Sequence, residues 1–410
     1  MSIIPYRTPL EILKTKNYVS LIEGDPGIGK TTLALASALD SDKVTYISYN
    51  ETEDSILSKA KNIVGKDPKN LKIIRMLSGN QKVVFSSILS SLKEGSTVII
   101  DSVNAFLWNE KGMHQRALMQ LVYEASKHKN GSLIFISEGS NDGTNFLRYL
   151  VDSYIKLEKE EILGLNARKI TVLKDRDYPV SNYPFYFTFH NGFKLFEASY
   201  SFSALYGALK SKVKGWERPF SSSVISEPGI TLYVQDTSLS SSFSKLYRYW
   251  LVVDYLLRKR KVVYLARPDE DETDIKETIK KMAGHSKGLI VAKAKGNLEE
   301  DLQGISNFND SLIVSDLLTW ETEALVDPSK YEFSLRRLLE ATLKMNLVVI
   351  LFAYSNYLGL STVKKYALRE RWLLEKETHV FLRTLKPPGP LYYVKLIEDK
   401  EPGLNLYMMS

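Results

Sequence analysis

The feature that most restricts the fold of this 410-residue chain is an order of strand-like and helix-like segments that occurs twice. Five segments of the second half correspond in order and pattern to five of the first. Residues 229–236 correspond to 17–24, 261–275 to 43–56, 310–320 to 96–106, 345–356 to 130–141 and 378–385 to 153–160. A repeat of this length indicates duplication of a whole domain rather than the short period of a solenoid.

Within the first half, apolar β-branched runs alternate with segments of helical spacing, which predicts a parallel sheet with crossover helices. The predicted strands are 17–24, 43–50, 71–77, 96–102 and 131–139, and the clearest predicted helices are 31–40 and 113–128. Three further runs, 153–161, 167–177 and 183–196, are expected as antiparallel strands at the edge of that sheet. The predicted fold class is α/β, with two tandem domains of this kind.

The predicted domains are residues 1–197 and 229–410, separated by a connector at 198–228 that is rich in Ser, Gly and Lys. The chain has no cysteine, which excludes disulfides and thiolate zinc sites. No apolar run reaches membrane-spanning length and the first residues lack the core of a signal peptide, so we expect a cytoplasmic protein and no membrane partner. The net charge of +7 permits an anionic partner without requiring one.

One segment of the first half carries a phosphate-binding pattern. The sequence GDPGIGKTT fits G-x-x-x-x-G-K-[ST], follows a predicted strand and opens a predicted helix. The predicted nucleotide-binding residues are Gly24, Asp25, Pro26, Gly27, Ile28, Gly29, Lys30, Thr31 and Thr32. In this pattern backbone N–H groups cradle phosphates, the lysine reaches the β- and γ-phosphates, and the hydroxyl after it holds Mg²⁺.

A second metal-binding group is expected at the end of a later strand. Asp101 closes the apolar run TVIID, where a carboxylate can accept a hydrogen bond from Mg²⁺-bound water. An aspartate that merely ends a strand is the alternative, but the phosphate loop favours the metal interpretation. The predicted cofactors are therefore ATP and Mg²⁺, with Thr31 and Asp101 as the metal-binding residues.

These motifs, in this order, resemble the RecA-type ATPase superfamily and, within it, the KaiC-like branch. In that branch a Glu-Glu pair and a Thr follow the second strand, and Asn50, Glu51 and Thr52 align with them. The resemblance also matches Ser137-Glu138 to a family stretch at a strand end, and Asp152 to a family aspartate. It covers about residues 8–197 and implies a RecA-like fold for each half.

The same resemblance implies a role for two cations. Lys174 and Arg176 match the lysine and arginine that reach the nucleotide of a neighbouring subunit, and residues two apart on a strand share a face. A solvated strand edge is the alternative for both. One intact and one decayed half in a single chain also resembles archaeal GvpD-type P-loop regulators.

Asn50 is the departure that bears on catalysis. The residue aligned with it in RecA-type enzymes takes the proton of the attacking water, which an amide cannot do at neutral pH. Glu51 is next in the chain and is the replacement base; Asn50 chosen for a turn is the alternative. We therefore predict ATP binding with slow hydrolysis, and the predicted catalytic residues are Asn50, Glu51, Lys30, Lys174 and Arg176.

The second half lacks the phosphate-loop pattern. Residues 235–245 contain no glycine, and Lys245 comes too late for the motif. Ser315 is expected at the position of Asp101, with Asp316 next to it, and 393–402 is expected to lack the Lys-x-Arg pair. We therefore predict that this half binds no ATP and serves assembly or partner binding.

Three functions follow from this. The first is a nucleotide-dependent regulator that acts on a protein partner or self-associates through RecA-like edges. The alternatives are a RecA/RadA-like DNA-binding ATPase in recombination or repair, and a non-catalytic ATP-sensing assembly protein. The basic run RKRK at 258–261 could contact phosphates but suits a helix C-terminus equally, and the acidic run 268–274 follows it closely. Nucleic acid is therefore a weaker expectation than a protein partner.

Overall fold

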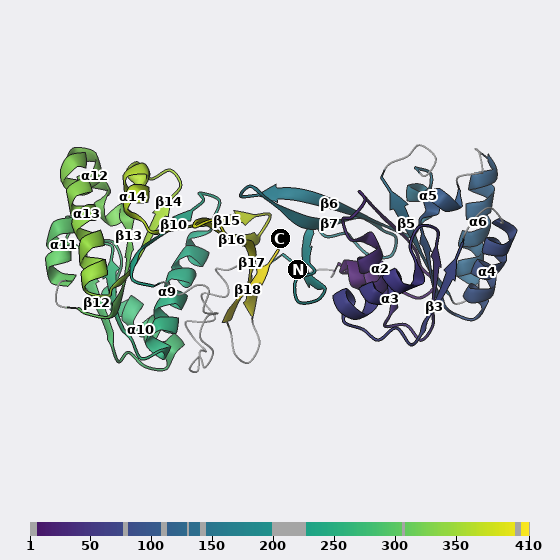
Figure 1. Cartoon of the computed structure of the whole chain (residues 1–410), viewed down its shortest axis with the longest axis horizontal. Helices are drawn as coiled ribbons and strands as arrows, with labels where there is room; N and C mark the ends of the chain where they lie inside the picture. The colour runs from purple at the N-terminus through teal and green to yellow at the C-terminus, as the bar shows by residue number, and fades with distance from the viewer. Residues whose placement is uncertain are drawn as a thin grey trace. The chain divides into compact units, whose positions relative to one another are not determined.

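The structure is a computed structural model that describes residues 6–76, 81–107, 113–128, 131–139, 145–198, 227–305, 308–397 and 403–409. It divides into two compact units, residues 1–198 with 409–410, and residues 199–408. Each unit is described by itself (Figure 1). The connector predicted at 198–228 lies outside the described residues, except for Ala198 and residues 227–228.

The N-terminal unit is built on one nine-stranded sheet. Its strands are β1 (Val19–Gly24), β2 (Val44–Ser48), β3 (Leu71–Arg75), β4 (Thr97–Asp101), β5 (Ser132–Glu138), β6 (Ser153–Ile162), β7 (Leu165–Asp175), β8 (Phe185–Thr188) and β9 (Lys194–Phe196). They lie in the order β3-β2-β4-β5-β1-β6-β7-β8-β9. Pairs from β3 to β6 are parallel and pairs from β6 to β9 are antiparallel.

The C-terminal unit repeats this sheet. Its strands are β10 (Gly229–Gln235), β11 (Lys261–Ala266), β12 (Leu289–Lys293), β13 (Ser311–Asp316), β14 (Val348–Tyr354), β15 (Arg369–Lys376), β16 (His379–Lys386), β17 (Leu391–Ile397) and β18 (Gly403–Met408). Their order, β12-β11-β13-β14-β10-β15-β16-β17-β18, matches the first sheet strand for strand. The predicted fold class is thereby confirmed: two tandem RecA-like α/β domains with antiparallel edge strands.

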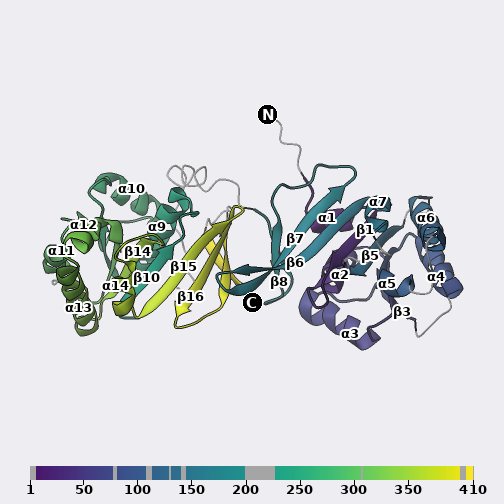
Figure 2. The same cartoon turned by 90° about the horizontal axis from the view of Figure 1, so that it is seen from above.

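Helices cover both faces of each sheet (Figures 1 and 2). Those of the N-terminal unit are α1 (Pro9–Leu13), α2 (Lys30–Ala38), α3 (Glu53–Ser58), the π-helix η1 (Lys59–Val64), α4 (Gln81–Lys93), α5 (Val103–Phe106), α6 (Met113–His128) and α7 (Leu147–Leu150). Those of the C-terminal unit are α9 (Ser241–Leu257), α10 (Glu272–Ala283), α11 (Leu298–Ile305), the 3₁₀-helix η2 (Leu317–Trp320), α12 (Glu321–Val326), α13 (Pro328–Lys344) and α14 (Leu360–Tyr366).

Two apolar cores form in each unit, one on each face of its sheet. In the N-terminal unit α1 and α2 pack against one face, and α4 and α6 pack against the other. In the C-terminal unit α9 and α10 occupy the first position, and α13 and α14 the second. The central parallel strands are buried on both faces, as their continuous apolar runs predict.

The strand registers correct the predicted correspondence of the two halves. Asp101 on β4 is aligned, through its partner on β5, with the residue of β1 that stands two before Gly24. Asp316 on β13 is aligned in the same way, through β14, with the residue of β10 that stands two before Gln235. Gly24 and Gln235 each end the central strand of their sheet. Asp101 therefore corresponds to Asp316, and the expectation of Ser315 at this position was wrong by one residue.

The edge strands need a larger correction. The segment expected to match 153–160 was 378–385, but those residues form most of β16, which corresponds to β7. The true counterpart of β6 is β15, at 369–376. The predicted strand at 183–196 is also two strands, β8 and β9, separated by a turn in which Asn191 and Gly192 have positive φ.

Candidate nucleotide site

The predicted phosphate loop joins β1 to α2 at the carboxyl edge of the parallel strands. Asp25, Pro26 and Gly27 are exposed, whereas Ile28 is buried in the core and anchors the loop. Gly29 is the residue before α2 and has no side chain to cap the helix. The first N–H groups of a helix need outside partners, and anions are favoured there. The loop therefore presents backbone donors to solvent.

Glycine is required at two loop positions for different reasons. Gly27 has φ 73° and a Cβ there would meet no heavy atom within 4 Å. Gly29 has φ 114°, and a Cβ there would lie 2.4 Å from Cζ of Phe189. Positive φ is strained for residues with a Cβ. Gly27 is thus fixed by backbone conformation alone and leaves open space above it, while Gly29 is fixed by packing as well.

Lys30 is buried at the start of α2 and its ammonium is held inside the loop. Its Nζ donates to the carbonyl oxygens of Gly24 at 2.8 Å and Asp25 at 2.9 Å. Burial lowers the pKa of Lys30, and nearby carboxylates, Glu138 first, act in the opposite direction. An ammonium has three donors, so a third N–H remains for an anion beside the two contacts seen here.

Thr31 and Asp101 meet as predicted from the sequence. The Thr31 hydroxyl donates to Oδ2 of Asp101 at 2.7 Å, and the Tyr46 hydroxyl donates to the same oxygen. Burial raises the pKa of Asp101, although both hydrogen bonds oppose this. Burial and the charge of Asp101 raise the pKa of Tyr46 well above its usual value. Tyr46 belongs to this site, although no motif in the sequence marks it.

The residues at this position fit a magnesium ion bound together with phosphates. The described residues contain no group of three or more His, Cys, Asp or Glu side chains able to hold a metal without help. Mg²⁺ is commonly bound by one or two carboxylates and keeps its other positions for water and substrate phosphates. A hydroxyl and a carboxylate in contact, next to a phosphate loop, supply that donor set.

Asn50 and Glu51 follow β2 at the same edge of the sheet. Asn50 is exposed. The backbone of Glu51 is fixed by the Ser48 hydroxyl, which accepts from its N–H at 3.0 Å and donates to its carbonyl at 2.8 Å. The Glu51 carboxylate accepts from Lys59 Nζ at 2.5 Å and from the Ser55 hydroxyl at 3.2 Å. Its charge also contributes to the raised pKa of Asp101.

Ser137 and Glu138, at the end of β5, are oriented by Asn104, which no motif in the sequence marks. The Asn104 Oδ1 accepts from the Ser137 hydroxyl at 3.1 Å and from the Glu138 N–H at 2.9 Å. The Glu138 side chain is exposed. Asn104 lies in the short helix α5, which begins two residues after Asp101, so the segment that follows β4 orients the end of β5.

Lys174 binds the carbonyl oxygens at the end of a short helix, and a lysine of the second unit does the same. Its Nζ donates to the carbonyls of three residues at the end of α7, with Val151 the nearest at 2.6 Å. Lys386 occupies the same ladder position, immediately before the same register shift. Its Nζ donates to the carbonyl of Ala367 at the end of α14. The expected position of the pair, 393–402, was therefore wrong: the lysine is kept at 386, and Pro388 stands where Arg176 would be, so the Lys-x-Arg pair itself is absent.

Arg176 is placed differently from Lys174. It forms an ion pair with the fully buried Asp152 at 3.0 Å, and its Nη1 donates to the Tyr123 hydroxyl at 2.6 Å. Lys127 pairs with the same carboxylate at 2.5 Å. About half of the Arg176 side chain is exposed. Arg176 therefore has partners in its own unit while its guanidinium reaches the surface.

The loop between β10 and α9 in the second unit has the same length as the phosphate loop and a different chemistry. Leu239 is buried where Ile28 is, so the apolar anchor is kept. Ser240 caps α9 with φ −61°, and its hydroxyl accepts from the third residue of the helix. Its own N–H donates to Oε2 of Glu375 at 2.9 Å. A protein carboxylate therefore takes the anion position at this helix start.

Asp316, the counterpart of Asp101, is bound by a cation from its own unit. Arg248 Nη1 lies 3.2 Å from Oδ2 of Asp316, and Glu270 is 3.7 Å from the same guanidinium. Arg248 and Asp316 are both buried. Burial raises the pKa of Asp316 although the charge of Arg248 opposes this. The carboxylate is thus retained in the second unit but is already neutralised.

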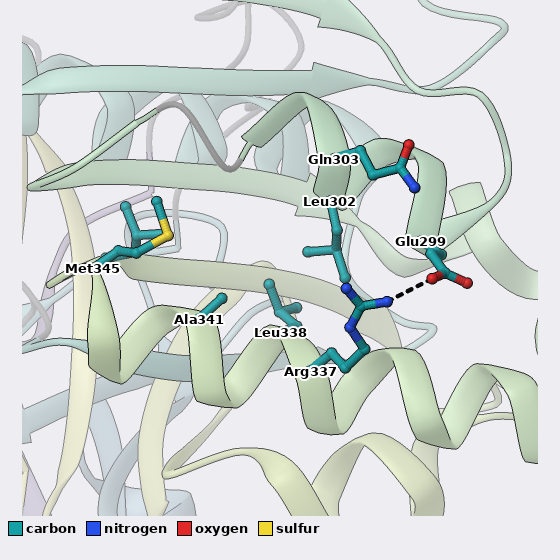
Figure 3. A pocket seen from close by; sticks show the side chains of 8 residues that line it. Glu299, Leu302, Gln303, Arg337, Leu338, Ala341 and Met345 are labelled. Atoms are coloured by element: carbon teal, nitrogen blue, oxygen red, sulfur yellow. Dashed lines mark hydrogen bonds and ion pairs between the residues drawn. The ribbon is translucent and has the colours of Figure 1, made fainter.

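A small hollow in the C-terminal unit lies between α11 and α13 (Figure 3). Its volume is about 220 Å³, and an ion pair of Arg337 with Glu299 crosses it. Met345 and Leu347, just before β14, also line it, so it lies near the amino ends of the strands. Ligands of open α/β sheets bind at the carboxyl ends. This hollow is therefore no counterpart of the phosphate loop.

No helix in the described ranges combines the length and apolar character needed to cross a bilayer.

The N-terminal unit is similar to known ATPase domains. Residues 75–198 match the family model described as the KaiC ATPase. The chain is 28% identical over 176 residues to the DNA repair protein RadA of Aquifex aeolicus, covering 39% of this chain and 38% of that protein. It is also 28% identical over 169 residues to RadA of Treponema pallidum, covering 38% of this chain and 35% of that protein.

A third similarity extends over nearly the whole length of a relative. The chain is 24% identical over 208 residues to the DNA repair and recombination protein RadB of Methanococcus maripaludis, covering 45% of this chain and 94% of that protein. The match to the two RadA proteins spans little more than a third of their length. Together these similarities and the family match support a P-loop ATPase domain of the RecA superfamily.

Proposed function

We propose that this protein is a nucleotide-dependent regulator whose N-terminal unit binds Mg-ATP and hydrolyses it slowly. The observation that carries the proposal is the junction of β1, the glycine loop and α2. An uncapped helix start and the buried ammonium of Lys30 stand next to the Thr31–Asp101 pair. These are the donors that a triphosphate and its metal require. Mg²⁺, when bound, neutralises developing charge on the phosphates.

The slow rate follows from the chemistry of Asn50 and Glu51, the two residues expected at the position of the catalytic base. Asn50 can hold a water molecule by hydrogen bonds but cannot accept its proton. Glu51 is the base that remains, and its carboxylate is engaged by Lys59. Arg176 is the remaining candidate for a contact with the nucleotide of a neighbouring domain, because Lys174 is used at the end of α7.

The C-terminal unit is proposed to bind no nucleotide and to act in assembly or in contact with a protein partner. Two contacts support this. Glu375 accepts the N–H at the start of α9, and Arg248 neutralises Asp316. Both groups would have to be displaced before a phosphate and a metal could enter. The decayed arrangement is also what the archaeal GvpD-type resemblance leads us to expect.

The second candidate function is a DNA-binding ATPase in recombination or repair, which the similarity to RadA and RadB favours. In the basic run 258–261, Arg258 pairs with Asp254 and Arg260 pairs with Asp310. Pairing reduces the charge available to a phosphate backbone. Salt-dependent retention of single- or double-stranded DNA would favour this function over the first.

Steady-state phosphate release tests the proposed chemistry. A general base contributes about 10²–10⁴-fold, so we expect Asn50→Glu to raise turnover by at least tenfold. Asn50→Gln is the matched control, because it lengthens the side chain without adding a base, and it should stay near the wild-type rate. Lys30→Ala should lose nucleotide binding. Equal turnover of wild type and Asn50→Glu would mean that this position does not limit the reaction.

A further inference from the structure

The contact between Lys59 and Glu51 restricts the carboxylate that the proposed mechanism uses as a base. Both carboxylate oxygens of Glu51 lie 2.5 Å from the Lys59 ammonium. Ser55 adds a third hydrogen bond, to Oε2 at 3.2 Å. Ser55 and Lys59 are four residues apart, so they lie on one face of the helix that follows Glu51. The carboxylate is therefore turned toward this helix.

Hydrogen bonds to the backbone of Glu51 restrict movement of its main chain. The Ser48 hydroxyl bonds both its N–H and its carbonyl, which ties it to the end of β2. Thr52 then caps α3. Movement of the carboxylate is left to side-chain rotation, which requires the ion pair to open. The side chains of Glu51 and Lys59 are 26% and 29% exposed, so water can replace each partner when they separate.

Lys59 lies at a local irregularity of the helix. It follows the last residue of α3 and begins the π-helix η1, and such wide turns are frequent at functional sites. The corresponding helix of the C-terminal unit is arranged differently. Seven residues after the helix cap, where the N-terminal unit has Lys59, the C-terminal unit has the buried Thr278. Glu270, which stands one residue before the cap as Glu51 does, lies instead 3.7 Å from the guanidinium of Arg248. The fold therefore forms without this ion pair.

We propose that Lys59 is a positioning residue that holds the Glu51 carboxylate away from the attacking water, so that hydrolysis waits for the ion pair to open. The inference rests on the proposed function. When the pair opens, Glu51 accepts a proton from water as the water oxygen bonds to the γ-phosphorus. The bond from that phosphorus to the bridging oxygen breaks, and ADP leaves. The slow turnover then has two sources, the amide at position 50 and the restrained base.

The test compares kcat and KM for phosphate release at saturating Mg-ATP. Lys59→Met should raise kcat about two- to fivefold, the scale of one partly exposed ion pair, with KM unchanged. Lys59→Arg keeps the charge and should return the rate to that of wild type. Lys61→Met, on the exposed face of η1, is the matched control and should change neither value. Adding Glu51→Gln to Lys59→Met should remove the gain.

A measurement on the unaltered chain guards against misfolding of the variants. Salt screens a partly exposed ion pair, so kcat of wild type at saturating Mg-ATP should rise as salt increases from low to physiological ionic strength. A kcat that falls in folded Lys59→Met, or a gain that survives Glu51→Gln, overturns the inference alone. Absence of Mg-ATP binding to wild type, measured by titration, overturns the proposed function instead.

Discussion

The two loop glycines, Gly27 and Gly29, give different expectations for the same substitution. Gly27→Ala should destabilise the N-terminal unit by about 1–2 kcal/mol, since only the left-handed backbone is strained. Gly29→Ala should cost more, because its methyl group would also meet Phe189. Urea unfolding with a probe in this unit measures both. Equal destabilisation by the two variants would contradict the packing described for Gly29.

Gly65 provides a control for the role of Gly27 in binding. Gly65 has φ 74° and, like Gly27, open space where an added methyl group would lie, but it ends η1 rather than the phosphate loop. Gly65→Ala should show a similar loss of stability with normal Mg-ATP affinity. Gly27→Ala should lose affinity as well, because the added methyl group occupies the space above the loop. Normal affinity in Gly27→Ala would argue against a phosphate at this position.

We expect Asp101 to favour Mg-ATP binding while its buried carboxylate lowers the stability of the folded N-terminal unit. Burial raises its folded pKa above 3.8, so stability from its protonation is present at low pH and is lost as pH rises through the folded pKa. Asp101→Asn should therefore raise the melting temperature at pH 7 without nucleotide, and this gain should disappear at about pH 3–4. Mg-ATP affinity should fall in the same variant.

The exposed Asp25 in the same loop is the matched control, and Asp25→Asn should leave the melting temperature unchanged. A melting-temperature gain in Asp101→Asn that does not vary with pH would show that the carboxylate is not strained by burial.

The short helices α7 and α14 share one stabilising device, a lysine bound to their last carbonyls. Lys174→Met and Lys386→Met should each destabilise their own unit by about 1.5–3 kcal/mol, the range for hydrogen bonds of a charged donor. Hydrolysis should be unchanged in folded Lys174→Met and reduced in Arg176→Ala with affinity kept. A lower kcat in Lys174→Met with normal stability would restore the role that the family resemblance implies for Lys174.

The strands and the phosphate loop could be predicted because their signals are local. The apolar run before Gly24, the glycines and Lys30 lie within a few residues, and Asp101 ends a run of its own. Tyr46 could not be predicted, because its contact with Asp101 joins positions 55 residues apart and no motif marks it. The alignment of the two halves could not be predicted to the residue either. The apolar run before Asp316 can be aligned with the run before Asp101 in two ways, which place either Ser315 or Asp316 opposite Asp101.

The strand β15 was missed because its sequence, RERWLLEK, carries charges that usually mark a surface. Arg371 is buried and donates to the Tyr233 hydroxyl at 2.6 Å, and Glu370 pairs with Lys364. Those partners come from β10 and α14 and are unknown until the chain is folded. The lysine at position 386 was overlooked for the same reason, since its equivalence to Lys174 depends on pairing with β15.

The two units share one topology but differ in the groups at the start of the helix that follows the central strand. In the N-terminal unit the helix start is open and Lys30 is held by its own loop. In the C-terminal unit Glu375 and Arg248 supply an anion and a cation at the corresponding places. Loss of one member of a buried charge pair strongly destabilises a protein, so the C-terminal unit is expected to keep Arg248 paired with Asp316. One chain should therefore hold one nucleotide.

Isothermal titration of Mg-ATP into the whole chain tests this claim most directly. We predict one site per chain in wild type and in Ser241→Ala, the residue that starts α9 as Lys30 starts α2, and no binding in Lys30→Ala. Two sites per chain, or one site that survives Lys30→Ala, would contradict the account.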